Sequence, residues 1–423
     1  MLGLGIDIGT SGVRTAVVDA QGKLLSSARA NHHEQADASV DARLWWHAVG
    51  DCMDAQVNAL QSISLSPGDI TDAAIDGTSG TMVIVDEVLD PITPALMYNS
   101  SGFGAEAEVI ERHAEPGSIT RGANSALARF LRLQSSDTAR RGKHLLHQAD
   151  FILAKFLGAA AGSDENNVLK LGYDPGTGLW PAWFEAAGVR TALLPTVHRV
   201  GATCGKICET AARRWGLSPA LRFHAGTTDS IAAFMASGAD QLGDAVTSLG
   251  TTLAVKLLSD VRVDDLERGI YAHKIGDRWL VGGASNTGGG VLAGHFTPAE
   301  LAELSARIDP AQPTGLDYYP LLKPGERFPV NDPDYPPRLS PRPDDDAHFL
   351  QGMLEAIARI EAEAYHALID LGAPEPRQIF TAGGGAKNVA WTQIRRRIIG
   401  WPLAEGGAEE ASIGVARLAV SAP

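Results

Sequence analysis

Three short segments of this chain combine glycines with hydroxyl or carboxylate side chains, a combination suited to binding phosphate groups. The first reads Asp7-Ile8-Gly9-Thr10-Ser11-Gly12. Glycines let the backbone approach a phosphate closely and turn N–H groups toward it, and the Thr and Ser hydroxyls add donors. Asp7 could hold Mg²⁺ through water beside those phosphates. The alternative is a plain hairpin turn that Asp7 caps.

The second segment, His224-Ala225-Gly226-Thr227-Thr228-Asp229-Ser230, places a carboxylate after a turn of small residues and before a helical run over 231–237. Asp229 is there well placed to face a cleft, and it would equally serve as a helix N-cap.

The third segment, Gly383-Gly384-Gly385 followed by Lys387 and Asn388, joins a strand to a helix. The glycines leave a flat backbone surface on which a purine can lie, and a helix N-terminus favours anionic groups. A tight strand–helix connection is the alternative.

The elements around these segments suggest a duplication. Residues 2–8 and 14–18 read as a hairpin whose turn is the first segment, with 24–29 as a third strand. Residues 245–257 repeat the pattern, with Gly250-Thr251-Thr252 at the turn. The copies lie about 240 residues apart, roughly one domain and its connection.

The rest of the chain alternates strands and helices, which indicates an α/β class, and 423 residues predict two or three domains. Residues 41–60, 389–399 and 409–420 have helical periodicity, and 70–75 and 82–85 read as strands. Residues 310–343, rich in Pro, Asp and Arg, predict a long irregular excursion.

Composition and missing motifs exclude several classes of protein. The formal net charge of -14 repels phosphate backbones, so we expect no nucleic-acid partner. Three cysteines make no disulfide framework, the start does not read as a signal peptide, and no stretch reaches the roughly 20 apolar residues of a membrane span. We therefore expect a cytoplasmic protein with no membrane partner. A P-loop motif and the protein-kinase motifs are absent.

Together the segments resemble the FGGY family of carbohydrate kinases over nearly the whole chain. GIDIGTSGVRTAVVD and SLGTT are similar to the family's two phosphate hairpins, HAGTTDS to the segment with the catalytic aspartate, and TAGGGAKN to the adenosine-binding turn. The resemblance implies two RNase-H-like domains of the actin/hexokinase superfamily around a central cleft. Residues 1–236 would form the sugar-side domain and 237–405 the nucleotide-side domain, with a C-terminal helix within 406–423 packing back on the first.

A closer likeness, carried by IDGTSGT, NNVLKLGYD and AGTTDSIAAF, is to compact D-ribulose kinases of the xylulokinase-like type. It implies ATP- and Mg²⁺-dependent phosphorylation of D-ribulose to D-ribulose 5-phosphate, and it allows a homodimer. The alternatives are a D-xylulose kinase, another sugar or polyol kinase of the family, or a non-catalytic sensor of sugar and nucleotide.

The resemblance also implies a role for each motif residue. Asp229 would be the catalytic base, and Asp7 would hold the metal. The sugar would be bound by Asp7, Ser11, Gly12, Val13, Arg14, Ser79 and Asp229. ATP would be bound by Thr10, Ser11, Gly250, Thr251, Thr252, Gly383, Gly384, Gly385, Lys387 and Asn388.

One departure concerns the sugar. Many family members have Trp-Asn-Asp followed by Arg where this chain reads Tyr98-Asn99-Ser100-Ser101-Gly102. The carboxylate missing at Ser100 is usually linked to holding sugar hydroxyls, so a polyol-kinase or aldose-kinase assignment does not carry over.

Overall fold

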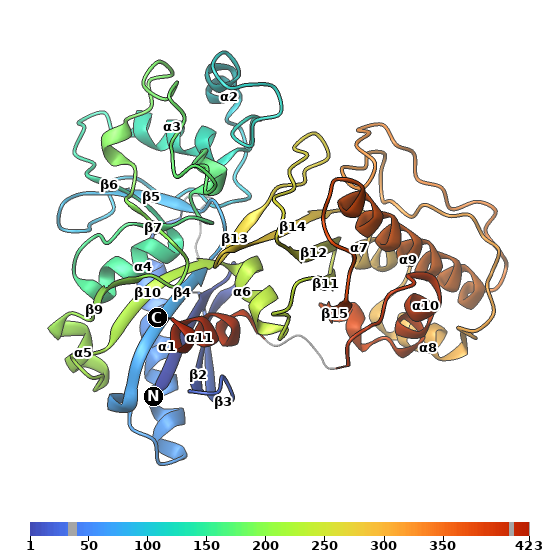
Figure 1. Cartoon of the computed structure of the whole chain (residues 1–423), viewed down its shortest axis with the longest axis horizontal. Helices are drawn as coiled ribbons and strands as arrows, with labels where there is room; N and C mark the ends of the chain where they lie inside the picture. The colour runs from blue at the N-terminus through green and yellow to red at the C-terminus, as the bar shows by residue number, and fades with distance from the viewer. Residues whose placement is uncertain (33–39, 406–409, 423) are drawn as a thin grey trace. The chain divides into compact units, whose positions relative to one another are not determined.

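A computed structural model describes residues 1–32, 40–405 and 410–422. The chain divides into two compact units (Figure 1), one of Met1–Ala236 with Glu409–Pro423 and one of Ser237–Ala408. Strands and helices alternate in both, so the predicted α/β class is confirmed. Among the helices that the structure describes, none is long and apolar enough to cross a membrane.

The first unit is built on a sheet in the order β3-β2-β1-β4-β10-β9. β1 and β4 pair in parallel, as do β4 and β10, so their carboxyl ends meet at one edge. The other neighbours are antiparallel, and β1–β2 is the first predicted hairpin. The strands are β1 (Leu2–Ile8), β2 (Gly12–Asp19), β3 (Leu24–Asn31), β4 (Ile70–Gly77), β9 (Thr203–Lys206) and β10 (Arg222–Thr228).

Helices cover both faces of this sheet (Figure 1). One face packs on α1 (Arg43–Ser62), α4 (Gln148–Leu157) and α5 (Glu209–Trp215), the other on α6 (Asp229–Ala236) and α11 (Ala411–Ser421). α11 lies directly on β1, because a Cβ added at Gly5 would stand 2.0 Å from the carbonyl oxygen of Ser412. A larger residue at Gly5 would push the helix off the sheet. Residues 406–409 of the expected C-terminal segment lie outside the described residues.

The chain between β4 and β9 forms a smaller layer of the same unit. Its core joins Met82 and Ile84 of one strand to Phe130 and its helical neighbours. Its elements are β5 (Met82–Val85), α2 (Gly104–Glu111), α3 (Ala126–Ser136), β6 (His144–His147), β7 (Ser163–Asp164) and β8 (Val197–His198).

The second unit repeats the hairpin arrangement in a sheet ordered β13-β14-β12-β11-β15. β11 and β12 form the second predicted hairpin, and β15 pairs with β11 in parallel, as β4 does with β1. The elements are β11 (Asp244–Leu249), β12 (Leu253–Ser259), β13 (His273–Ile275), β14 (Arg278–Ala284), α7 (Gly289–Ala293), α8 (Pro298–Arg307), α9 (Asp346–Asp370), β15 (Gln378–Ala382) and α10 (Val389–Ile398).

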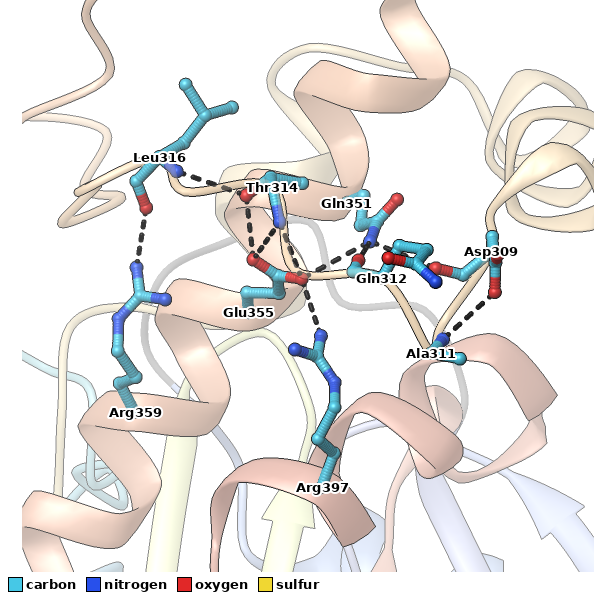
Figure 2. Close-up of polar contacts among 9 residues, drawn as sticks. All are labelled: Asp309, Ala311, Gln312, Thr314, Leu316, Gln351, Glu355, Arg359 and Arg397. Carbon is cyan, nitrogen blue, oxygen red and sulfur yellow. Dashed lines mark hydrogen bonds and ion pairs between the residues drawn. The ribbon is translucent and has the colours of Figure 1, made fainter.

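Glu355 of α9 anchors the irregular chain between α8 and α9 (Figure 2). Its buried carboxylate accepts hydrogen bonds from the Thr314 backbone N (3.1 Å) and Oγ1 (2.7 Å), and from Arg397 Nη2 of α10 (2.6 Å). Gln351, one turn earlier, donates to Glu355 and to the Asp309 and Gln312 carbonyls. Burial alone would raise the pKa of Glu355, but the hydrogen bonds from Thr314 and Arg397 lower it.

Because the folded pKa of Glu355 is lowered, its stabilising contribution is present above the unfolded pKa of about 4.3 and is lost as the pH falls through the folded pKa. We expect Glu355→Gln to reduce the free energy of unfolding by about 1–3 kcal/mol at pH 7 and by less at pH 3.5. Urea denaturation of both proteins at the two pH values measures the difference. An equal loss at both would contradict the assignment.

Candidate active site

The first phosphate-type turn joins β1 to β2 in the first unit. It is closed by a hydrogen bond from Gly9 N to Gly12 O (2.9 Å), and Thr10 and Ser11 are exposed at its tip. A Cβ on Gly12 would lie 2.3 Å from Ala30 O of β3, so this position holds only glycine. The side chain of Val13 is buried in the core, which limits any contact of that residue with a ligand to its backbone.

Asp7 is the last residue but one of β1, next to this turn, and is 5% exposed. Arg14 stands opposite it on β2, and Arg14 Nη1 lies 3.3 Å from Asp7 Oδ2. Arg14 Nε also lies 3.7 Å from a Glu410 oxygen, just before α11. Burial raises the pKa of Asp7 although Arg14 opposes that effect. The expected metal ligand is therefore a buried carboxylate with a guanidinium beside it.

A third carboxylate, Asp76, joins Asp7 and Asp229 at the carboxyl edge of the sheet. The parallel registers pair Asp7 with Asp76 and Asp76 with Thr227, two residues before Asp229. Asp76 is fully buried, and no N–H or hydroxyl of the described chain donates to either of its oxygens. Burial, and then the negative charge of Asp7, raises the pKa of Asp76 well above its ordinary value. Asp76 is therefore protonated more readily than an ordinary carboxyl group, and in its protonated form it can donate to Asp7.

Sequence reasoning missed Asp76, although a signal for it was present. Asp76-Gly77-Thr78-Ser79-Gly80 repeats the pattern of the first segment, a carboxylate at the end of a buried strand before a glycine and hydroxyl turn. Ser79, an expected sugar ligand, lies in this second turn. Its Oγ is buried and has no hydrogen-bond partner within the described part of the chain.

Asp229 is the first residue of α6 and is half-buried. One of its carboxylate oxygens accepts from the Ser230 backbone N at 2.6 Å. The negative charge of Asp229 also contributes to the raised pKa of Asp76, so the three carboxylates interact electrostatically. The structure thus brings Asp7, Arg14, Ser79 and Asp229 to one edge of one sheet.

The remaining expected residues lie in the second unit. The turn Gly250–Thr252 between β11 and β12 is held by hydrogen bonds from Gly289 N to Gly250 O (2.8 Å) and from Gly290 N to Thr251 O (2.9 Å). The glycine turn after β15 packs beside it, because a Cβ on Gly383 would stand 2.7 Å from Leu249 O. Gly383 has φ +83°, a backbone conformation that favours glycine.

Gly384 to Lys387 form a single 3₁₀ turn, and Gly384 is open to solvent. Asn388 Oδ1 caps α10 by accepting from Trp391 N (3.0 Å), and its Nδ2 donates to Ser305 Oγ (2.8 Å). The Asn388 side chain thus has a structural role. Any contact it makes with a nucleotide comes in addition to these bonds.

The carboxylates near the first turn are compatible with a metal ion that binds together with a nucleotide. Across the described residues, no three His, Cys, Asp or Glu side chains are grouped to hold a metal. Mg²⁺ bound with a nucleotide usually keeps several waters and needs only one or two carboxylates beside the phosphates. Asp7 offers one such carboxylate.

Comparisons with known proteins agree with these features. The model of the N-terminal domain of the FGGY family of carbohydrate kinases matches residues 2–131, and that of its C-terminal domain matches residues 245–422. Xylulose kinases of Streptomyces coelicolor and Escherichia coli are 26% and 23% identical, over 95% and 98% of this chain and 83% and 89% of theirs.

The fold is also found in solved structures. The crystal structure of a xylulose kinase from Rhodospirillum rubrum aligns with this chain with a TM-score of 0.84 at 19% sequence identity. The alignment covers 99% of this chain and 89% of the xylulose kinase. This agreement confirms the predicted two-domain fold of the actin/hexokinase type. The two family models between them span most of the chain in the order that the motifs predict, and the chain belongs to the FGGY family of carbohydrate kinases.

Proposed function

We propose that this carbohydrate kinase transfers the γ-phosphoryl group of ATP, carried with Mg²⁺, to a hydroxyl of a ketopentose. The observation that carries the proposal is the row of carboxylates at the ends of β1, β4 and β10, where Asp229 is half-buried and Asp7 and Asp76 share a strand register. Free thiols at Cys52, Cys204 and Cys208 fit a reducing cytoplasm as the place of the reaction.

Each group has one task in the proposed step. The sugar oxygen bonds to the γ-phosphorus while the bond from that phosphorus to the β,γ-bridging oxygen breaks and ADP leaves. Asp229 accepts the hydroxyl proton, a contribution typically worth about 10²–10⁴-fold. Asp7 would hold the metal, which would neutralise negative charge on the phosphates, and the backbone and hydroxyl donors of the two hairpin turns would bind the phosphates.

Two ketopentoses compete as the acceptor. The segments around Asp76, Asn166 and Asp229 resemble D-ribulose kinases, whereas several relatives found by comparison are named xylulose kinase. These sugars differ only in the configuration at C3, so a few contacts decide between them.

An ADP-release assay with D-ribulose, D-xylulose, L-ribulose, glycerol or no sugar tests the proposal. We expect the highest kcat/KM with one of the two D-ketopentoses and little release without sugar. ADP release that is equal with and without every sugar would overturn it.

The raised pKa of Asp76 leads to a prediction of its own. Asp76→Asn keeps a buried donor toward Asp7 without adding charge, so we expect kcat/KM within about tenfold of wild type. Asp76→Ala leaves Asp7 without that donor and opens a cavity, and we expect a larger loss. Steady-state kinetics of the two variants makes the comparison. Equal losses would contradict this, because they would show that an amide donor of the same size cannot replace the carboxyl group.

A further inference from the structure

Arg129 of α3 is a buried cation whose partners are all backbone carbonyls. The residue is 3% exposed. Its Nε donates to Gly80 O (3.0 Å), and its Nη1 donates to Tyr98 O (3.0 Å) and Asn124 O (2.9 Å). No carboxylate of the described chain forms an ion pair with it, whereas Arg395, equally buried, lies against Glu361. Burial lowers the pKa of Arg129 to about 10, so the side chain is charged at neutral pH.

Burying a charge without an opposite charge is costly. We therefore expect Arg129 to have a role for which a buried cation is needed. Hydrogen bonds from an ionised donor are roughly twice as strong as neutral ones, and a guanidinium directs several of them at fixed angles. Arg129 can therefore hold several carbonyls in one fixed geometry, which a neutral side chain would do only weakly.

Two of the three segments that Arg129 joins are those expected around the sugar. Gly80 follows Ser79 in the turn after Asp76. Tyr98 opens the stretch in which Ser100 replaces the family's usual carboxylate. Asn124 precedes Ser125, the N-cap of α3.

The fit between Arg129 and the turn is close. Gly80 has φ +81°, and a Cβ added there would stand 2.9 Å from Arg129 Nη2. A second bond ties the same two segments, because Thr81 Oγ1 accepts from Tyr98 N at 3.0 Å. Thr81 Oγ1 itself accepts from Thr78 Oγ1 (2.7 Å). The turn 78–81 and the stretch 98–100 are thus held as one surface, with Arg129 behind it.

We propose that Arg129 is a positioning residue that fixes the Ser79–Gly80 turn and the Tyr98–Ser100 stretch as one rigid acceptor-binding surface, and so sets sugar affinity and selectivity. The inference rests on the proposed kinase function. With no carboxylate at Ser100, the acceptor meets hydroxyls and backbone groups there. Such groups discriminate between sugars only if the backbone is held still. The expected ATP contacts of the second unit are untouched by Arg129.

Kinetics of Arg129→Lys and Arg129→Met tests the proposal. Lysine keeps the charge but lacks the planar fork that reaches several carbonyls. We expect the KM for the better ketopentose to rise at least about tenfold in both variants, and the preference for it over its C3 epimer to fall, while the KM for ATP stays within about threefold.

Arg190→Met is the matched control, because Arg190 is another largely buried arginine side chain of this unit, and its partners, Asp137 Oδ2 (2.7 Å) and Gly142 O (3.4 Å), belong to neither segment. If Arg190→Met raises the sugar KM as much as Arg129→Met at equal loss of stability, the positioning role is refuted.

Two measurements keep the test decisive if Arg129→Met does not fold or if the sugar panel fails. Gly80→Ala keeps the cation but places a Cβ against Nη2, and we expect the same rise in sugar KM. Hydrogen–deuterium exchange needs no turnover, and we expect faster exchange over residues 79–81 and 98–100 in Arg129→Lys than in wild type or Arg190→Met. Unchanged exchange in both segments overturns the inference, whereas faster exchange in a protein that phosphorylates no sugar supports it and refutes only the proposed function.

Discussion

Asp229→Asn is expected to lower kcat by at least about 10²–10⁴-fold, because it removes the group that we propose takes the proton from the sugar hydroxyl. Asn keeps the shape of the side chain, so the start of α6 and the bond to Ser230 N can persist. The KM for ATP should change little, since the expected ATP contacts come mainly from the two hairpin turns and the glycine turn. The measurement is steady-state kinetics with saturating sugar, together with ATP binding by calorimetry.

Asp240→Asn provides the matched control for this variant. Asp240 is an exposed carboxylate shortly after α6, and its side chain accepts only from Gln241 in the described structure. We expect wild-type turnover from it. Near-normal turnover by Asp229→Asn would show that another group, or water, takes the proton.

Features encoded locally in the chain could be predicted from the sequence. Each hairpin combines two apolar strands with a Gly-Thr turn. The hairpins at residues 2–18 and 245–257 can therefore be predicted from the residues within each segment. The strand before Gly383 and the helix after Asn388 are equally local. The position of Asp229 directly after β10 follows from the same reading.

Features that depend on register or on a distant segment could not be predicted in this way. Asp76 becomes a partner of Asp7 only through the parallel pairing of strands 69 positions apart. Gly5 faces Ser412 of α11, almost the whole chain away. Arg129 looks like any helix arginine until α3 packs on the turn at Gly80. Tertiary packing decides whether such groups are buried, and the sequence pattern of a single helix or strand does not predict that packing.

Substitutions in a buried ion pair of the second unit are expected to have a large effect on stability. Arg395 of α10 and Glu361 of α9 are both fully buried and form a bidentate ion pair. Arg395 Nε donates to Glu361 Oε2 (2.8 Å), and Arg395 Nη2 donates to Glu361 Oε1 (2.7 Å). Arg395 Nη1 also donates to Thr381 Oγ1 of β15 (2.7 Å), and Thr247 Oγ1 of β11 donates to Glu361. Thr247 and Thr381 face each other in register, just before the Gly250 and Gly383 turns.

Arg395→Met is therefore expected to reduce the free energy of unfolding by about 3–5 kcal/mol, because it leaves Glu361 charged and unpaired in the core. Glu361→Met should cost a similar amount by leaving Arg395 unpaired. The double variant should lose clearly less than the sum of the two, since it removes both charges at once. Urea denaturation of the four proteins gives the coupling energy, and exposed Arg396→Met is the control on the same helix.

The double variant also separates stability from positioning. If the pair only stabilises the core, a double variant that recovers stability should also recover the wild-type KM for ATP. If the pair aligns β11 with β15, so that the Gly250 and Gly383 turns meet the nucleotide in register, the KM for ATP should stay raised after stability returns. We expect the second outcome, because Thr247 and Thr381 lose their charged partners in the double variant even though the core is again neutral.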